Sequence, residues 1–190
     1  MGKILCFFYD QMADFEVTLA LHLINTRSKQ DIVTIGYEIA PVKSQAGFTY
    51  LPDMTVTDAL QIQAIEALII PGGPIGEQRP EISDLIQKIY HERKLVAAIC
   101  FGPQFLGRAG ILDKHHFTTS CPEEKIKSLG VPDPFPRHNF VNQRVVRDGN
   151  VLTAQGRAFV DFAFAICDWL RVFENTAAMD ELQKEYKANE

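Results

Sequence analysis

The sequence has little that would place the protein outside the ordinary globular class. It has only four cysteines among 190 residues, and no two of them form a Cys-x-x-Cys pair. Scattered cysteines at this length argue against a disulfide scaffold and favour a reducing cytoplasm, which is the location we expect. The longest apolar runs fall far below the roughly 18 residues that a membrane-spanning helix needs, so we expect no membrane partner.

An excess of basic residues is also lacking. The 19 Lys and Arg residues are outnumbered by 24 Asp and Glu residues, which gives a formal net charge of −5. No basic run or basic helix face is present, so we expect no nucleic-acid partner. His115 and His116 are adjacent, have no third ligand at useful spacing, and predict no metal site. The length of 190 residues and the hydrophobic content of 46% together predict a single domain over residues 1–190.

Strand and helix patterns alternate through the first 110 residues. Short apolar runs predict buried strands, and apolar residues at helical spacing predict the helices between them. This order predicts an α/β fold, a three-layer sandwich with a mainly parallel sheet and helices on both faces. The predicted strands cover 3–9, 32–37, 67–70, 95–99, 116–120, 143–146 and 151–154, with a small hairpin within 44–56. The predicted helices cover 15–24 (capped by Asp14), 81–93, 104–109, 159–173 and 178–189.

A cysteine stands at the sharpest predicted bend. The apolar strand "LVAAI" at 95–99 ends at Cys100, and "FGP" then turns the chain into a helix. Such a bend holds a side chain out at the carboxyl edge of the sheet, as in the nucleophile elbow of hydrolases. A helix amino terminus stabilises a thiolate, so we expect the pKa of Cys100 to lie below its ordinary value of roughly 8.5. We interpret Cys100 as a nucleophile, although a small buried cysteine at a strand end gives the same pattern.

Two backbone amides and one carboxyl complete the predicted site. The N–H of Phe101 is one candidate donor to an oxyanion, and the N–H of Gly73, where a side chain would block close approach, is the other. Glu16 falls at the start of the first predicted helix. One explanation of Glu16 is structural, because an acidic residue in the first turn stabilises a helix. The functional interpretation is that Glu16 lies beside Cys100, has a raised pKa and transfers a proton.

Four stretches together resemble one known family. They are "YDQMADFE", "ALIIPGGPIGEQ", "VAAICFGPQFLGRAGIL" and "DGNVLTAQGRAFVDFAFAI", in this order. In outline, residues 3–170 resemble the ThiJ/PfpI family, which lies within the class I glutamine amidotransferase-like superfamily and includes a parkinsonism-associated deglycase. The resemblance implies a flavodoxin-like sandwich, usually dimeric. It also implies that Cys100 is the reactive cysteine and Glu16 its protonated carboxyl partner.

The sequence departs from several branches of that family. Family peptidases carry His directly after the cysteine, where this chain has Phe101, and Phe cannot accept the thiol proton. Glutamine amidotransferases have a late His-x-Glu pair, and none follows Cys100. Isonitrile hydratases of the family carry Asp in place of Glu and Thr after the cysteine. Glyoxalase-like members keep a His before Pro, where this chain has Cys121, a poorer proton shuttle near neutral pH.

Cys121 and His138 are auxiliary candidates. If Cys121 lies close to Cys100, a sulfenic acid formed on Cys100 would be resolved as a disulfide. The simpler interpretation is that Cys121 fills the space of the lost His. His138 would supply an imidazole from the Pro-rich stretch 130–139, a position more typical of a solvated loop histidine.

Three functional hypotheses follow. The first is a stress-related, cysteine-dependent enzyme that acts on a small electrophile such as a 2-oxoaldehyde, as a glyoxalase or deglycase does, without metal or organic cofactor. The second is a non-enzymatic redox sensor or stress-protective protein that uses Cys100. The third, ranked lowest, is a peptidase or amidase completed by a His from a partner chain. The partners we expect are a small-molecule electrophile and a second copy of the chain.

Overall fold

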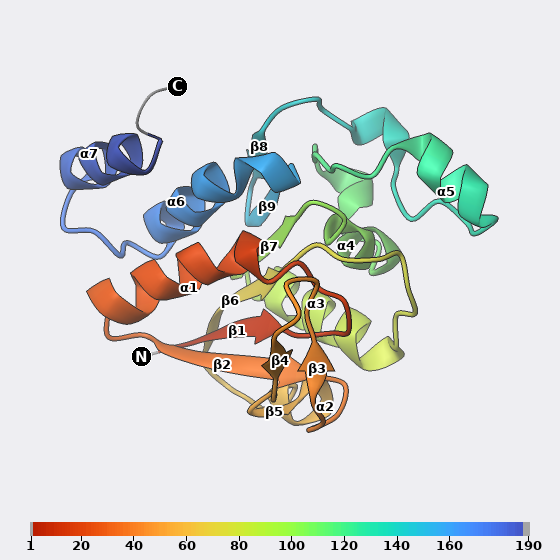
Figure 1. Ribbon diagram of the computed structural model, residues 1–190, viewed down its shortest axis with the longest axis horizontal. Coiled ribbons are helices and arrows are strands. Elements are labelled where there is room, and N and C mark those ends of the chain that lie inside the picture. Colours follow the sequence, from red (N-terminus) through yellow and green to blue (C-terminus); the bar gives the residue numbers. More distant parts are fainter. Residues whose placement is uncertain (1, 188–190) are drawn as a thin grey trace.

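The computed structural model describes residues 2–187, and a seven-stranded sheet lies at its centre (Figure 1). The strand order is β5-β2-β1-β6-β7-β9-β8, and every neighbouring pair is parallel except β8 with β9. A separate antiparallel pair, β3 with β4, forms a hairpin whose first strand lies just before the stretch 44–56 in which a hairpin was predicted. The strands are β1 (Lys3–Phe7), β2 (Asp31–Gly36), β3 (Val42–Lys43), β4 (Thr49–Tyr50), β5 (Met54–Thr55), β6 (Ile65–Ile70), β7 (Leu95–Ile99), β8 (Val145–Asp148) and β9 (Val151–Ala154).

Helices cover both faces of this sheet, as the sequence predicted. One apolar core joins the sheet to α1 and α6, and a second joins the other face to α2, α3 and α4 (Figure 1). The central strand β7 is buried along its whole length, which explains why "LVAAI" is continuously apolar. The helices are α1 (Phe15–Arg27), α2 (Val56–Ala59), α3 (Pro80–His91), α4 (Pro103–Arg108), α5 (Glu123–Leu129), α6 (Phe159–Trp169) and α7 (Thr176–Tyr186). This is the predicted flavodoxin-like α/β arrangement.

Two local predictions are wrong. Residues 116–120 form no strand, because only one bridge, between Phe117 and Phe140, pairs this segment with another. Asp14 does not cap α1 with its side chain. Its carboxylate instead accepts hydrogen bonds from the hydroxyls of Ser44 at 3.0 Å and Tyr50 at 2.8 Å, which ties the β3–β4 hairpin to the start of the helix.

The carboxyl-terminal helices differ from their predicted bounds. α6 ends at Trp169 rather than at residue 173, and Arg171 adopts a positive φ of 53° that stops the helix. α7 begins at Thr176 because the side chain of Asn175 accepts a hydrogen bond from the N–H of Ala178. Residues 188–190, at the end of the predicted helix 178–189, lie outside the described residues. Within residues 2–187, no helix has the length and apolar character to cross a membrane.

Candidate active site

Cys100 lies at the carboxyl edge of the sheet, in a conformation that few residues other than glycine adopt. Its φ is +62°, which places it in the left-handed region directly after β7. Three hydrogen bonds hold this backbone. The N–H of Cys100 donates to the carbonyl of Ala154 at 2.8 Å, and its own carbonyl accepts from the hydroxyl of Thr119 at 2.6 Å and the N–H of Ser120 at 2.9 Å. The predicted strand-to-helix bend is therefore present, and β9 and the segment after it fix its shape.

Glu16 and Cys100 lie side by side, although their positions in the sequence are 84 apart. Glu16 is in the first turn of α1 and is only 2% exposed. Its Oε2 accepts a hydrogen bond from the N–H of Gly72 at 2.7 Å, and its carboxylate also accepts one from the Cys100 thiol. The parallel sheet explains the meeting, because the turns that follow β1, β6 and β7 leave the same edge.

The electrostatics of this pair differ from the prediction for Cys100. Burial, followed by the negative charge of Glu16, raises the pKa of the Cys100 thiol to about 12, whereas the N–H of Phe101 and the Ser120 hydroxyl lower it. Burial also raises the pKa of Glu16, as predicted. The helix after Cys100 thus contributes a stabilising amide, but desolvation and the neighbouring carboxylate outweigh it. The two side chains compete for one proton, which the thiol or the carboxyl can hold.

Two glycines form walls against this pair, and neither was among the predicted site residues. A Cβ on Gly72 would lie 2.4 Å from Oε2 of Glu16 and 2.6 Å from Cβ of Cys100. A Cβ on Gly156 would lie 2.7 Å from Oε1 of Glu16 and 3.0 Å from Sγ of Cys100. Gly72 could have been found as the neighbour of Gly73 in "PGG", but no local signal marks Gly156. Ser120, which hydrogen-bonds to the Cys100 sulfur, was missed for the same reason.

The structure places the two predicted amide donors differently. The N–H of Phe101 lies at the sulfur of Cys100. Gly73 packs against Tyr9, since a Cβ at this position would lie 2.6 Å from the Tyr9 hydroxyl. Its N–H donates to no carbonyl or side chain among residues 2–187. Gly72, rather than Gly73, is the glycine in contact with the Cys100 side chain.

The auxiliary candidates lie outside this pair. Cys121 is buried, and its Sγ is 3.8 Å from the carbonyl oxygen of Pro122. Burial raises the pKa of Cys121, and Arg137 lowers it, whereas neither Cys100 nor Glu16 is among the groups that act on it. All four cysteines are free thiols. His138 is exposed, in the short helical turn Arg137–Asn139.

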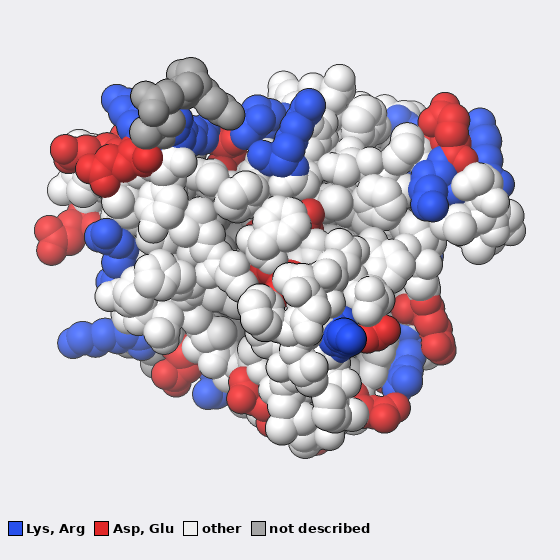
Figure 2. All heavy atoms as spheres, in the orientation of Figure 1, with Lys and Arg blue, Asp and Glu red and all other residues white. Residues whose placement is uncertain are grey.

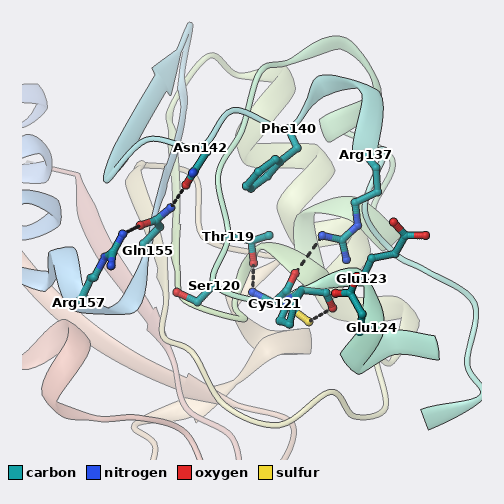
Figure 3. Close-up of a pocket in the computed structure, with 11 residues that line it drawn as sticks. Thr119, Ser120, Cys121, Glu123, Glu124, Arg137, Phe140, Asn142, Gln155 and Arg157 are labelled. Atoms are coloured by element: carbon teal, nitrogen blue, oxygen red, sulfur yellow. Dashed lines mark hydrogen bonds between the residues drawn. The ribbon is translucent and has the colours of Figure 1, made fainter. Parts of the chain in front are cut away.

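Ser120, which hydrogen-bonds to the Cys100 sulfur, also lines a cavity of about 630 Å³. Figure 3 shows the residues that surround this cavity. Arg157 and Gln155 lie on one side of it, and Arg137 with Glu123 and Glu124 on the other (Figure 3). The remaining lining residues are Thr119, Cys121, Pro122, Phe140 and Asn142. Polar side chains therefore surround a space large enough for a small organic molecule.

Comparison with known proteins supports the fold and the family. The chain is 28% identical over 185 residues to an isonitrile hydratase of Pseudomonas putida, which covers 94% of this chain and 75% of that protein. It is 26% identical over 161 residues to a deglycase of Thermococcus kodakarensis, covering 80% of this chain and 89% of the deglycase. The solved structure of a DJ-1 superfamily protein from Agrobacterium tumefaciens superposes with a TM-score of 0.83 at 29% identity, over 100% of both chains. Residues 2–168 match the model of one family, and on this evidence the chain belongs to the DJ-1/PfpI family.

Proposed function

We propose that the protein is a cysteine-dependent enzyme that converts small 2-oxoaldehydes into 2-hydroxy acids, without metal or organic cofactor. The observation that carries the proposal is the hydrogen-bonded pair of Cys100 and Glu16, enclosed by Gly72 and Gly156. A thiol beside a buried carboxyl is an activated nucleophile with its own proton acceptor. The close walls restrict the reacting group to a small, flat electrophile such as a dicarbonyl.

The first step needs the proton that the pair shares. As the sulfur of Cys100 attacks the aldehyde carbon, the thiol proton passes to Glu16, whose pKa burial has already raised. A hemithioacetal forms, and its oxyanion accepts a hydrogen bond from the N–H of Phe101, the amide that lies at the Cys100 sulfur. An amide held by the backbone stabilises this charge without reorganisation.

Glu16 then completes an internal oxidation and reduction. Glu16 first returns the thiol proton to the hemithioacetal oxygen and so becomes a carboxylate again. The carboxylate then removes the proton from the former aldehyde carbon and delivers it to the neighbouring ketone carbon, while the hydroxyl proton moves from the first oxygen to the second, so that the first carbon is oxidised and the second reduced. The product is a thioester of Cys100 with a 2-hydroxy acid. Water cleaves this thioester, releases the acid and restores the thiol, so that the net reaction consumes one water and no external oxidant.

Relatives with named activities agree with this type of chemistry. A deglycase and an isonitrile hydratase are both similar to this chain. Each activity is consistent with attack of a nucleophile on an electrophilic carbon. Phe101, which cannot accept a proton, makes peptidase chemistry the poorer candidate.

The test is formation of lactate from methylglyoxal without glutathione, with the native protein and with Cys100→Ser. We expect lactate from the native protein and at least a hundredfold less from the variant. A parallel assay supplies an isonitrile as substrate and measures the formamide that is formed from it. This assay tests isonitrile hydratase activity, the other activity named among the relatives. No lactate from the native protein contradicts the proposal, and reversible oxidation of Cys100 without turnover would support the redox-sensor hypothesis instead.

We also propose that the protein forms a homodimer through the face that carries the β3–β4 hairpin and the start of α1. Three large apolar side chains are exposed there: Phe15 at 53%, Phe48 at 64% and Leu51 at 62%. Figure 2 shows this face with few charged side chains over its centre and most of them at the margin. Large apolar side chains gathered on an uncharged face are typical of a protein interface.

A further inference from the structure

The cavity beside the reactive pair is joined to it by one side chain. The hydroxyl of Ser120 accepts a hydrogen bond from the N–H of Gly156 at 2.9 Å and also hydrogen-bonds to the sulfur of Cys100. Ser120 is a lining residue of the cavity. Gly156 contacts the Cys100 sulfur, and the next residue, Arg157, lines the cavity. A molecule bound to the sulfur therefore has the cavity within reach of its distal end.

The two arginines of this cavity differ in how their charge is neutralised. Arg137 pairs with the carboxylate of Asp133 at 2.8 Å and donates to the carbonyl of Cys121 at 2.9 Å. Arg157 forms no ion pair among residues 2–187. Its one side-chain hydrogen bond goes to Oε1 of Gln155 at 3.1 Å. Arg157, which directly follows Gly156 at the Cys100 sulfur, therefore carries an unpaired positive charge.

A buried amide holds that guanidinium in place. Gln155 is only 7% exposed, and its amide nitrogen donates to Oδ1 of Asn142 at 2.9 Å. This bond fixes the orientation of the Gln155 amide, so its oxygen is directed to Arg157 (Figure 3). One guanidinium nitrogen is thereby engaged, and the remaining donors are left for a ligand.

The charges of the cavity decide which anion would fit. A guanidinium binds one carboxylate through two parallel hydrogen bonds. Glu123 and Glu124 line the opposite side. Lys127 pairs with Glu123 at 2.7 Å, so the negative charge of Glu124 is the one that disfavours a dianion such as a phosphate ester. A ligand with a single carboxylate at the Arg157 end meets attraction there and little repulsion from the far side.

We propose that the substrate is a 2-oxoaldehyde that carries a carboxylate at its distal end. The dicarbonyl binds at Cys100, and the carboxylate binds at Arg157. This assignment rests on the proposed function, because it names the substrate class for the same reactive pair. Gln155 is a positioning residue, since it acts on the ligand through the Arg157 guanidinium.

The test compares two substrates of equal length. One is 4,5-dioxopentanoate, which carries the carboxylate, and the other is 2-oxopentanal, which lacks it; the products are 2-hydroxyglutarate and 2-hydroxypentanoate. We expect kcat/KM to be about tenfold higher for the anionic substrate, because a hydrogen-bonded charge pair contributes an effect of this order or more. The preference should lie mainly in KM and should weaken as salt rises.

Two variants complete the test. In Arg157→Gln the ratio of kcat/KM between the two substrates should fall to about one, since the charge is lost while a polar side chain remains. The matched control is Arg147→Gln, on β8, where the guanidinium pairs with Asp168 and stacks on Trp169 away from the cavity. This control should keep the preference of the native protein.

The outcomes separate the two proposals. Equal kcat/KM for both substrates in the native protein, or an unchanged ratio in Arg157→Gln, would overturn the substrate class and leave the glyoxalase-like activity in place. If neither substrate nor methylglyoxal is converted, the proposed function fails, and the substrate class fails with it. A ratio that falls equally in both variants shows a general effect of net charge, which also overturns the assignment of Arg157.

Discussion

Replacing Gly72 by alanine should damage the site and the fold together. The new Cβ would lie 2.4 Å from Oε2 of Glu16, 2.6 Å from Cβ of Cys100 and 3.1 Å from its Sγ. Neither neighbour can easily yield, because Glu16 is buried and bonded to the Gly72 N–H, and the Cys100 backbone is held in the left-handed region. Overpacking of this kind costs about 1–3 kcal/mol of the free energy of unfolding. In a protein of this size that lowers Tm by about 2–12 °C.

The assay needs a readout of the site and one of the fold. Gly72→Ala should displace the Cys100 thiol and the Glu16 carboxyl from their relative positions, so turnover of methylglyoxal should fall by about a hundredfold. Alkylation of Cys100, followed by peptide mass spectrometry, reports on the thiol even without turnover. The control is Gly76→Ala in the same loop, where a Cβ would meet nothing within 4 Å. If Gly72→Ala matches Gly76→Ala in Tm, alkylation rate and turnover, the close packing of Gly72 against Glu16 and Cys100 is contradicted.

Further predictions concern the proton of the pair and the assembly of the protein. Glu16→Gln should lower the pKa of the Cys100 thiol from about 12, because the carboxylate charge and hydrogen bond both raise it; alkylation against pH measures this, and an unchanged pKa would contradict it. The same variant should lose about a hundredfold in turnover, as a general acid–base residue does, whereas Asp10→Asn, an exposed carboxylate, should lose little. Burial raises the pKa of Glu16, so the folded state holds this proton more tightly than the unfolded chain. The stability that this proton contributes is present at low pH and is lost as pH rises through the raised pKa. Urea unfolding across that range should therefore depend less on pH in Glu16→Gln, and an equal slope would refute the linkage. Phe48→Glu should shift the sedimentation coefficient from dimer to monomer, whereas Leu129→Glu, 43% exposed on α5, should not.

The sequence predicted the architecture because the local signals agree with the global fold. The continuous apolar runs at 95–99 and 67–70 are what a parallel sheet covered on both faces requires. The apolar residues between these runs recur at helical spacing, and strands that alternate with helices predict an α/β sandwich. The segment 116–120 misled for a physical reason. Its side chains have the β-forming character of a strand, but Thr118 and Thr119 use their N–H and hydroxyl groups to bind β9 and the Cys100 carbonyl.

For the active site, sequence and tertiary structure made different contributions. The sequence by itself determined Cys100 as a nucleophile candidate, because a strand, a cysteine, a glycine and a proline in succession specify a sharp bend. It also indicated Glu16 and the Phe101 amide, both of which lie at the sulfur. Only the tertiary structure decided that the pKa of Cys100 is raised, since burial and the approach of Glu16 depend on segments far apart in the chain.

The tertiary structure alone also decided which glycines enclose the site. Gly72 and Gly156 follow different strands, and nothing local to either shows that its missing side chain makes room for the same sulfur. The unpaired charge of Arg157 is likewise a property of the folded chain, because no carboxylate among residues 2–187 pairs with it, whereas Arg137 pairs with Asp133 only four residues away. Local pattern fixes which residues can react, whereas the distances that control their protons and their substrate arise when separate strand ends converge at one edge of the sheet.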